Sequence, residues 1–381
     1  MTFHVDRIEL FDLTLPLVEP FIISGGVMRE RRSVVVAMHD GEGAVGYGES
    51  PPFELPFYSE ETLAGARDLL SRVLAPRLAG RDFAGPAAVD AALRVGIRGN
   101  PFARAALETA AWDLEADRRG TGIADLLATE TGEARAGRIP CGVALGIPAD
   151  RRLDTLSAWV GHAVARGYRR VKIKVMPGWD EAPVAAARAA LGQSGLPLTV
   201  DANGAYEWPA DEPALRRLDD AGLLYIEQPL APDEMVGHAE LAGRLRTPVC
   251  LDETLRDASA ARQVQALNGP AVWNVKVHRV GGLSEVCRIY QVARDYGATL
   301  WAGTMPESGI GSQAALAAAS LPRFTWPSDL EPSARWFGPG ADVVELEMSA
   351  DGMMDVPDRS VRHLLDRDRF AAAARPMTLA D

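Results

Sequence analysis

Short apolar segments alternate with segments rich in alanine, leucine and arginine from about residue 139 to residue 327. The apolar segments read IPCGVALGI, VKIKV, LTVDA, LYIEQ, VCLDE, VWNVKV and TLWAG, with RFTWP as a weaker eighth. Strands this short that are apolar on both faces are typical of a parallel sheet covered by helices, and their number fits a closed barrel. We therefore predict an α/β fold in which residues 138–335 form a (β/α) barrel.

Charged residues stand at the ends of five successive predicted strands. They are Lys174, Asp201, Glu227, Asp252 and Lys276, spaced by 27, 26, 25 and 24 residues. Each gap is one strand–helix unit, so in a barrel all of them would line the mouth where barrel enzymes build their sites. A lone acid at such a junction is most often a helix cap or a surface ion-pair partner. The whole series is hard to explain in that way, because unpaired charges are rarely buried.

The order of these charges, one lysine on either side of three acids, suggests a chemistry. Three carboxylates directed at one spot repel each other unless a divalent cation lies between them, and oxygen-only ligands suit Mg²⁺ or Mn²⁺. The lysines would then face each other across the metal. Burial and a nearby cation both lower the pKa of a lysine, which would let one act as a general base near pH 7. The sequence thus predicts abstraction of an α-proton.

The residues before the barrel have a different pattern. Residues 1–49 read as alternating strands, and residues 59–127 show helical periodicity. We expect an α+β domain over residues 1–130, completed by a C-terminal segment of about residues 340–381. The segment Gly41–Gly46 matches GxGxxG, but it lies between two predicted antiparallel strands with no helix after it, so we interpret it as a hairpin turn.

Charge and hydropathy exclude some classes of partner. The net charge of −12 and the pI near 5.1 disfavour nucleic acid and anionic membranes. No apolar run approaches the length of a membrane span. The N-terminus MTFHVDRIEL has no basic region followed by an apolar one, so we expect a cytoplasmic protein.

Several stretches together resemble the enolase superfamily, specifically its muconate-lactonizing subgroup. The carriers are VKIKV, VDANGAY, IEQPL, LDET, NVKVHRVGGLSE, GYGESPPFELPFYSEET, NPFARAALETAAWDLEAD and MPESGIGSQAALAAASLP. Within the subgroup they are most similar to N-succinylamino acid racemases and o-succinylbenzoate synthases. The resemblance spans nearly the whole chain and implies a modified (β/α)7β TIM-like barrel under an N-terminal α+β capping domain.

The resemblance also implies a role for each matching residue. Asp201, Glu227 and Asp252 would bind Mg²⁺, and Lys174 and Lys276 would be the acid/base groups. Lys172, on the same strand face as Lys174, would lower the pKa of that lysine and contact a substrate carboxylate. Further residues would support the metal ligands or contact substrate; these are Asn203 and Glu253, Ser24 and Tyr58 in loops that close the site, and Glu307 and Ser308 in the segment 305–311.

The resemblance implies a small-molecule carboxylate substrate, an enediolate intermediate and a homo-oligomer, but it leaves the reaction open. A racemase returns the proton to the opposite face, whereas a synthase expels water and uses Lys276 as a cation. Residues Ser24–Gly26, Val277–His278 and Pro306 depart from the subgroup pattern. The acidic Asp329-Leu330-Glu331 keeps dipeptide epimerase open as an alternative, and muconate-type cycloisomerase and a non-catalytic ligand-binding barrel are the others.

Overall fold

The computed structural model of the protein describes residues 2–23 and 26–378. Its largest sheet holds seven parallel strands whose order in space follows the chain. These are β7 (Gly142–Leu145), β8 (Arg170–Lys174), β9 (Leu198–Asp201), β10 (Ile226–Glu227), β11 (Val249–Leu251), β12 (Val272–Val275) and β13 (Thr299–Ala302). The predicted α/β fold is confirmed, and each strand was recognisable as a short apolar segment.

The segment 323–329 closes the ring between the first and last of these strands. Leu300 forms a parallel bridge with Phe324, and Cys141, just before β7, forms one with Ser328. The backbone N–H of Gly142 donates to the carbonyl of Ser328 at 2.7 Å. Since no helix of the barrel wall follows this last segment directly, the architecture is the expected (β/α)7β barrel.

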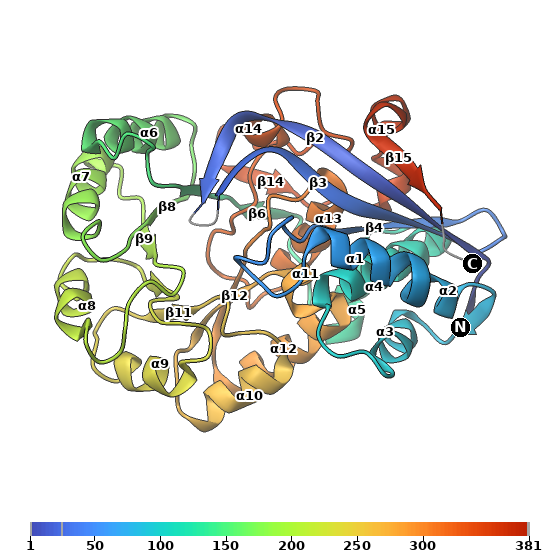
Figure 1. The fold of residues 1–381 in the computed structure, drawn as a ribbon, viewed down its shortest axis with the longest axis horizontal. Coiled ribbons are helices and arrows are strands. Elements are labelled where there is room, and N and C mark those ends of the chain that lie inside the picture. Colours follow the sequence, from blue (N-terminus) through green and yellow to red (C-terminus); the bar gives the residue numbers. More distant parts are fainter. Residues whose placement is uncertain (1, 24–25, 379–381) are drawn as a thin grey trace.

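Helices cover the outside of the barrel (Figure 1). They are α6 (Leu153–Ala165), α7 (Glu181–Leu191), α8 (Glu212–Asp219), α9 (Met235–Ala242), α10 (Ala258–Ala266), α11 (Val277–Val280), α12 (Leu283–Tyr296) and α13 (Gly309–Ala319). In β8, Val171 and Ile173 are buried in the apolar layer between strands and helices. Because side chains alternate along a strand, Arg170, Lys172 and Lys174 are directed to the barrel interior.

A second sheet lies beside the barrel mouth and is antiparallel, in the order β15-β2-β3-β4. Its strands are β2 (Arg7–Ile23), β3 (Gly26–His39), β4 (Val45–Ser50) and β15 (Ala374–Met377). The helical elements next to it are α1 (Leu63–Leu69), η1 (Leu70–Leu74), α2 (Ala75–Leu78), α3 (Pro86–Arg94), α4 (Pro101–Arg119) and α5 (Ile123–Thr131). Gly48 lets α4 approach β4, because a Cβ there would overlap the carbonyl of Ala106. The β3–β4 pairing makes the glycine-rich segment a hairpin turn, as predicted.

The remaining elements join the two parts. They are β1 (Phe3–Val5), paired with β5 (Arg81–Phe83), β6 (Arg138–Pro140), paired with β14 (Met353–Asp355), and α14 (Ser333–Trp336), η2 (Val361–His363) and α15 (Arg367–Ala373). The C-terminal segment thus pairs first beside the barrel, through β14, and then with β2, through β15. The division into a domain of residues 1–130 with 340–381 and a barrel of residues 138–335 stays a prediction. Among the described residues, no helix has the length and apolar character needed to cross a membrane.

Candidate active site

The strand register brings the predicted charges to one end of the barrel. Lys174 pairs with Asp201 across β8 and β9, and Asp201 pairs with Glu227 across β9 and β10. Asp252 comes directly after β11, and Lys276 comes directly after β12. The carboxylates of Asp201, Glu227 and Asp252 are buried, as is most of Lys276. The series predicted from spacing alone is therefore gathered at the carboxyl ends of consecutive strands.

Lys174 lies against the first acid of the series. Its Nζ is 2.6 Å from Asp201 Oδ2 and donates to Asn203 Oδ1 at 2.5 Å. Asn203 in turn donates to Glu253 Oε1 at 2.9 Å, and the other oxygen of Glu253 is buried without a hydrogen-bond partner. Burial would raise the pKa of Asp201, but Lys174 and Lys172 outweigh it and hold that pKa below its usual value.

Lys276 lies against the last acid and against a residue from the N-terminal part of the chain. Its Nζ is 2.9 Å from Asp252 Oδ2 and donates to the hydroxyl of Tyr58 at 2.9 Å. The guanidinium of Arg279 forms a close ion pair with the other oxygen of Asp252. Burial alone would lower the pKa of Lys276, but Tyr58 and Glu253 outweigh it, so the pKa is raised.

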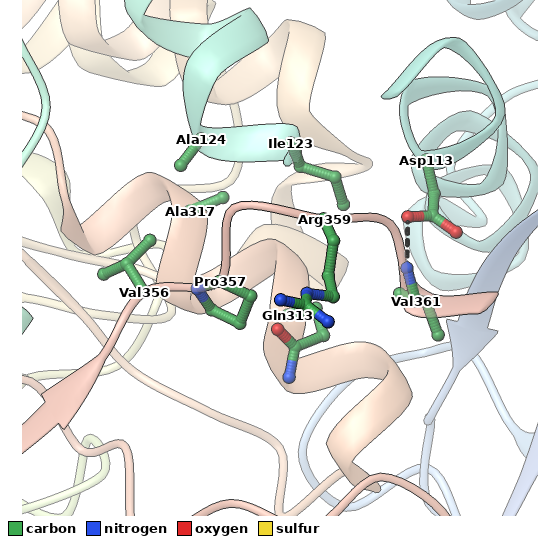
Figure 2. Close-up of a pocket in the computed structure, with 9 residues that line it drawn as sticks. All are labelled: Asp113, Ile123, Ala124, Gln313, Ala317, Val356, Pro357, Arg359 and Val361. Carbon is green, nitrogen blue, oxygen red and sulfur yellow. Dashed lines mark hydrogen bonds between the residues drawn. The ribbon is translucent and has the colours of Figure 1, made fainter. Parts of the chain in front are cut away.

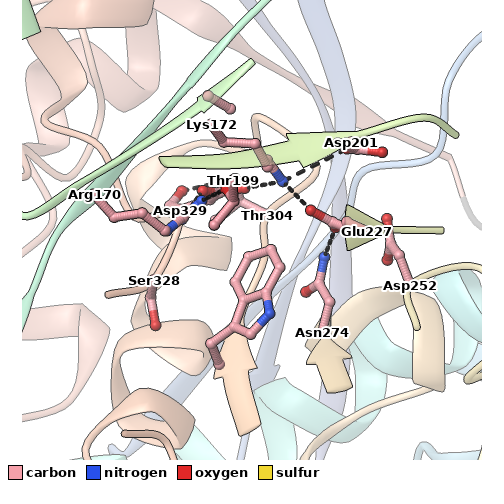
Figure 3. Close-up of polar contacts among 12 residues, drawn as sticks. Arg170, Lys172, Thr199, Asp201, Glu227, Asp252, Asn274, Thr304, Ser328 and Asp329 are labelled. Atoms are coloured by element: carbon pink, nitrogen blue, oxygen red, sulfur yellow. Dashed lines mark hydrogen bonds and ion pairs between the residues drawn. The ribbon is translucent and has the colours of Figure 1, made fainter. Parts of the chain in front are cut away.

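Lys172 occupies the middle of a buried network (Figure 3). Its Nζ lies 2.8 Å from Glu227 Oε2, 2.6 Å from Asp329 Oδ2 and 3.6 Å from Asp201 Oδ2. Arg170 pairs with the other oxygen of Asp329. The acids outweigh burial and raise the pKa of Lys172, so this lysine is a fixed buried cation. The predicted lowering of the Lys174 pKa by Lys172 stays a prediction.

The central acid, Glu227, is held on both sides. Asn274 Nδ2 donates to Glu227 Oε1 at 2.8 Å while Lys172 binds the second oxygen. Burial and the negative charge of Asp201 raise the pKa of Glu227. Two carboxylates forced this close together favour the presence of a cation between them.

The three acids were tested for their fit to a divalent metal. They are buried oxygen donors on neighbouring strand ends, which is the donor chemistry that Mg²⁺ prefers. In the part of the chain that the structure describes, no three His, Cys, Asp or Glu side chains are arranged as ligands of a metal ion. The carboxylate oxygens contact lysine and arginine instead. The donor set fits the ion, and the coordination itself stays a prediction.

The other predicted contact residues have mixed positions. Glu307 is buried; its Oε2 accepts the N–H of Met305 at 2.5 Å, and its Oε1 has no hydrogen-bond partner. Ser308 caps α13 and donates to Glu49 Oε2 at 2.5 Å, so its hydroxyl is engaged in packing. Ser24 lies outside the described residues. Substrate contacts of Glu307, Ser308 and Ser24 stay predictions.

The acidic pair proposed for an ammonium group is engaged with internal cations. Asp329 binds Arg170 and Lys172, and Glu331 pairs with Arg335 and accepts the N–H of Ala144 at 3.2 Å. Neither carboxylate is free in this arrangement to bind a substrate ammonium group.

Sequence reasoning did not single out Arg170, Asn274 or Arg279 as site residues. A strand-period signal existed for two of them: Arg170 precedes Lys172 by two positions, and Asn274 precedes Lys276 by two. Arg279 lies on the one-turn helix α11, where strand alternation no longer applies. No local pattern pointed to it.

A small cavity elsewhere in the molecule is separate from these strand ends (Figure 2). It lies where α4, α5, α13 and the segment 356–361 meet, and Asp113 on its edge accepts the N–H of Val361 at 2.9 Å. Its small size and its place between structural elements leave the strand ends as the candidate active site.

Comparison with known proteins agrees with this geometry. Residues 7–128 match the mandelate racemase / muconate lactonizing enzyme N-terminal domain, and residues 155–360 match the enolase C-terminal domain-like family. An N-succinylamino acid racemase of Thermus thermophilus is 42% identical over 93% of each chain. An o-succinylbenzoate synthase of Geobacillus kaustophilus is 36% identical over 94% of this chain and 92% of its own.

The fold comparison gives the same result. A crystal structure of an enolase-superfamily member of unknown function from Enterococcus faecalis superposes with a TM-score of 0.89 at 34% identity, covering 100% of both chains. The resemblance drawn from motifs is thereby confirmed. The chain belongs to the enolase superfamily, in its group of mandelate racemase and muconate lactonizing enzymes.

Proposed function

We propose that this enzyme abstracts the α-proton of a small-molecule carboxylate with the help of Mg²⁺, and that it is a racemase of N-succinylamino acids. One observation carries the proposal. Lys174 and Lys276 each pair with a different outer acid of the series, Asp201 at 2.6 Å and Asp252 at 2.9 Å. Two lysines on either side of one carboxylate group suit a reaction in which a proton leaves one face and returns to the other.

Each lysine would act on one face of the α-carbon. When the neutral amine of one lysine takes the proton, the ammonium of the other donates a proton to the opposite face, giving the other enantiomer. Asn203 orients Lys174 through its Oδ1, and Tyr58 does the same for Lys276 through its hydroxyl. Both partners limit the positions that the amines can take.

The remaining charges would organise the site. Asp201, Glu227 and Asp252 would hold Mg²⁺. When bound, the ion would supply positive charge for the substrate carboxylate and for the charge that develops on it as the proton leaves. Lys172 is fixed by Glu227 and Asp329, so it adds a permanent cation beside that carboxylate.

A second candidate, o-succinylbenzoate synthase, is favoured by the relatives of that name. That reaction begins with the same proton abstraction and then expels water, which requires Lys276 only as a cation. Its close ion pairing with Asp252 suits this role as well. The engaged oxygens of Asp329 weigh against the dipeptide epimerase alternative.

Proton exchange in D₂O tests the proposal. Purified enzyme with Mg²⁺ should incorporate deuterium at the α-carbon of N-succinylamino acids and interconvert their enantiomers, followed by NMR and chiral chromatography. Formation of o-succinylbenzoate from its hydrated precursor, without exchange of acylamino acids, would favour the synthase instead. Exchange with neither class would contradict both. The expected homo-oligomer and cytoplasmic location stay predictions.

A further inference from the structure

Arg31 is a buried arginine on β3 that the proposed chemistry does not use. Only 3% of the residue is exposed, and its guanidinium donates to four backbone carbonyls. Nε donates to Pro306 at 3.1 Å, and Nη1 donates to Pro52 at 3.1 Å and to Arg32 at 3.0 Å. Nη2 donates to Pro51 in a short contact. These acceptors belong to two segments that are far apart in the chain, residues 51–52 and residue 306.

The first of these segments leads directly to Lys276. The Arg31 guanidinium lies over the ring of Phe53 at 5.1 Å from its centre. Phe53 packs edge-on against Tyr58, with ring centres 6.0 Å apart, and Tyr58 binds Lys276. The loop 51–58 is thus fixed at its start by Arg31 and at its end by Lys276.

The second segment belongs to the barrel loop after β13. Glu49 accepts the N–H of Ser308 at 3.2 Å and the N–H of Gly311 at 2.9 Å, so β4 also holds this loop. Met305 packs with Phe53 in one buried apolar cluster. Burial lowers the pKa of Arg31 to about 10, which leaves it protonated near neutral pH.

We propose that Arg31 is a positioning residue that ties the loop 51–58 to the barrel loop 305–308 and thereby holds Tyr58 against Lys276. This inference rests on the proposed function, because it assigns Arg31 an effect on one of the two proton transfers. The planar fork of arginine is needed, since a lysine ammonium is a point charge on a flexible stem and cannot reach four carbonyls at once. Loss of the fork releases Tyr58 and leaves Lys174, which Tyr58 does not touch, in its place.

The Arg31→Lys variant tests this through the two enantiomers of one N-succinylamino acid, assayed separately for α-deuterium exchange. The Lys276→Ala variant identifies the enantiomer whose exchange depends on Lys276. For that enantiomer we expect Arg31→Lys to slow exchange on the order of tenfold or more, since small misplacements of reacting groups are costly. The other enantiomer should change by no more than about twofold. A general loss of folded enzyme would lower both rates equally.

Amide hydrogen exchange provides a readout independent of activity. Segment 53–58 should exchange faster in Arg31→Lys than in the wild type. Arg188→Lys is the matched control, because Arg188 donates to the carbonyls of Ala221 and Gly222 on the barrel wall, at 3.1 and 2.7 Å. It should change neither readout. Equal slowing of both enantiomers, or unchanged exchange in segment 53–58, would overturn the inference alone. Absence of α-deuterium exchange in the wild type would overturn the proposed function and the inference with it.

Discussion

The hydroxyl of Tyr58 lies 2.9 Å from Lys276 Nζ, and the same ammonium lies 4.6 Å from the centre of the Tyr58 ring. The two residues are 218 positions apart in the chain. One comes from the loop after β4 and the other from the end of a barrel strand. The orientation of one proposed acid/base group therefore depends on packing between the N-terminal part of the chain and the barrel.

Tyr58→Phe removes the hydroxyl and keeps the ring over Lys276. A hydrogen bond to a charged group contributes about 1.5–3 kcal/mol, so we expect kcat/KM for racemisation to fall about ten- to a hundredfold. Steady-state kinetics on both enantiomers measures this. Tyr296→Phe is the control, because Tyr296 donates to the carbonyl of Gly269 far from the site. Equal effects of the two variants would contradict a role for Tyr58 at Lys276.

Asp329→Asn removes the charge that compensates Arg170 and Lys172 in the barrel interior. Breaking one side of a buried ion pair leaves uncompensated charge, so we expect unfolding to become easier by about 3–5 kcal/mol in urea denaturation. Asp351→Asn should change stability little, because the pair of Asp351 with Arg138 is exposed. Similar small changes in both variants would show that the interior network does not contribute to stability.

Mg²⁺ should raise the thermal unfolding temperature of the wild type, with saturation as the metal concentration rises. A ligand that binds only the folded state stabilises it by mass action. Glu227→Gln should lose most of this response, because it removes one of three carboxylate donors. Each protein is compared with itself, with and without metal, so any destabilisation by the substitution cancels. A full response in Glu227→Gln would argue against Glu227 as a ligand.

His238 makes stability depend on pH. Its Nε2 accepts the N–H of Leu230 at 3.3 Å and its Nδ1 lies 2.7 Å from the carbonyl of Glu234, so the neutral ring is required. Burial lowers the pKa of His238 to about 4 from the ordinary 6.5. The unfolded chain therefore takes up a proton first as pH falls, and this contribution to stability is lost between pH 6.5 and 4.

The loss amounts to no more than about 3 kcal/mol, because one pKa unit corresponds to about 1.4 kcal/mol. Urea denaturation at several pH values should show a smaller decline in His238→Gln than in the wild type. His162→Gln, at an exposed position, should follow the wild type. Parallel curves for all three proteins would contradict this role of His238.

The barrel and the order of its charged strand ends were predictable from the sequence. Strands such as VKIKV and LTVDA are short, apolar and evenly spaced, and side-chain alternation directs Lys172 and Lys174 to the same face. The eighth segment was the weakest prediction, because it contributes only isolated bridges through Phe324 and Ser328.

The partners of these charges were not predictable. Asp329 was read as a candidate substrate contact at a loop, yet it neutralises Arg170 and Lys172 inside the barrel. Arg279 and Tyr58 reach Asp252 and Lys276 only through tertiary packing. Contacts between segments this distant leave no periodic signal in a single sequence.

The central claim is that Lys174 and Lys276 act on opposite faces of one α-carbon. It is tested most directly by measuring α-deuterium exchange of each enantiomer of an N-succinylamino acid in D₂O with the wild type, Lys174→Ala and Lys276→Ala. The account predicts that the wild type exchanges both enantiomers. Each variant should retain exchange of only one, a different one in each case, and lose racemisation by roughly a thousandfold or more. Retention of racemisation in either variant, or loss of the same enantiomer's exchange in both, would contradict the account.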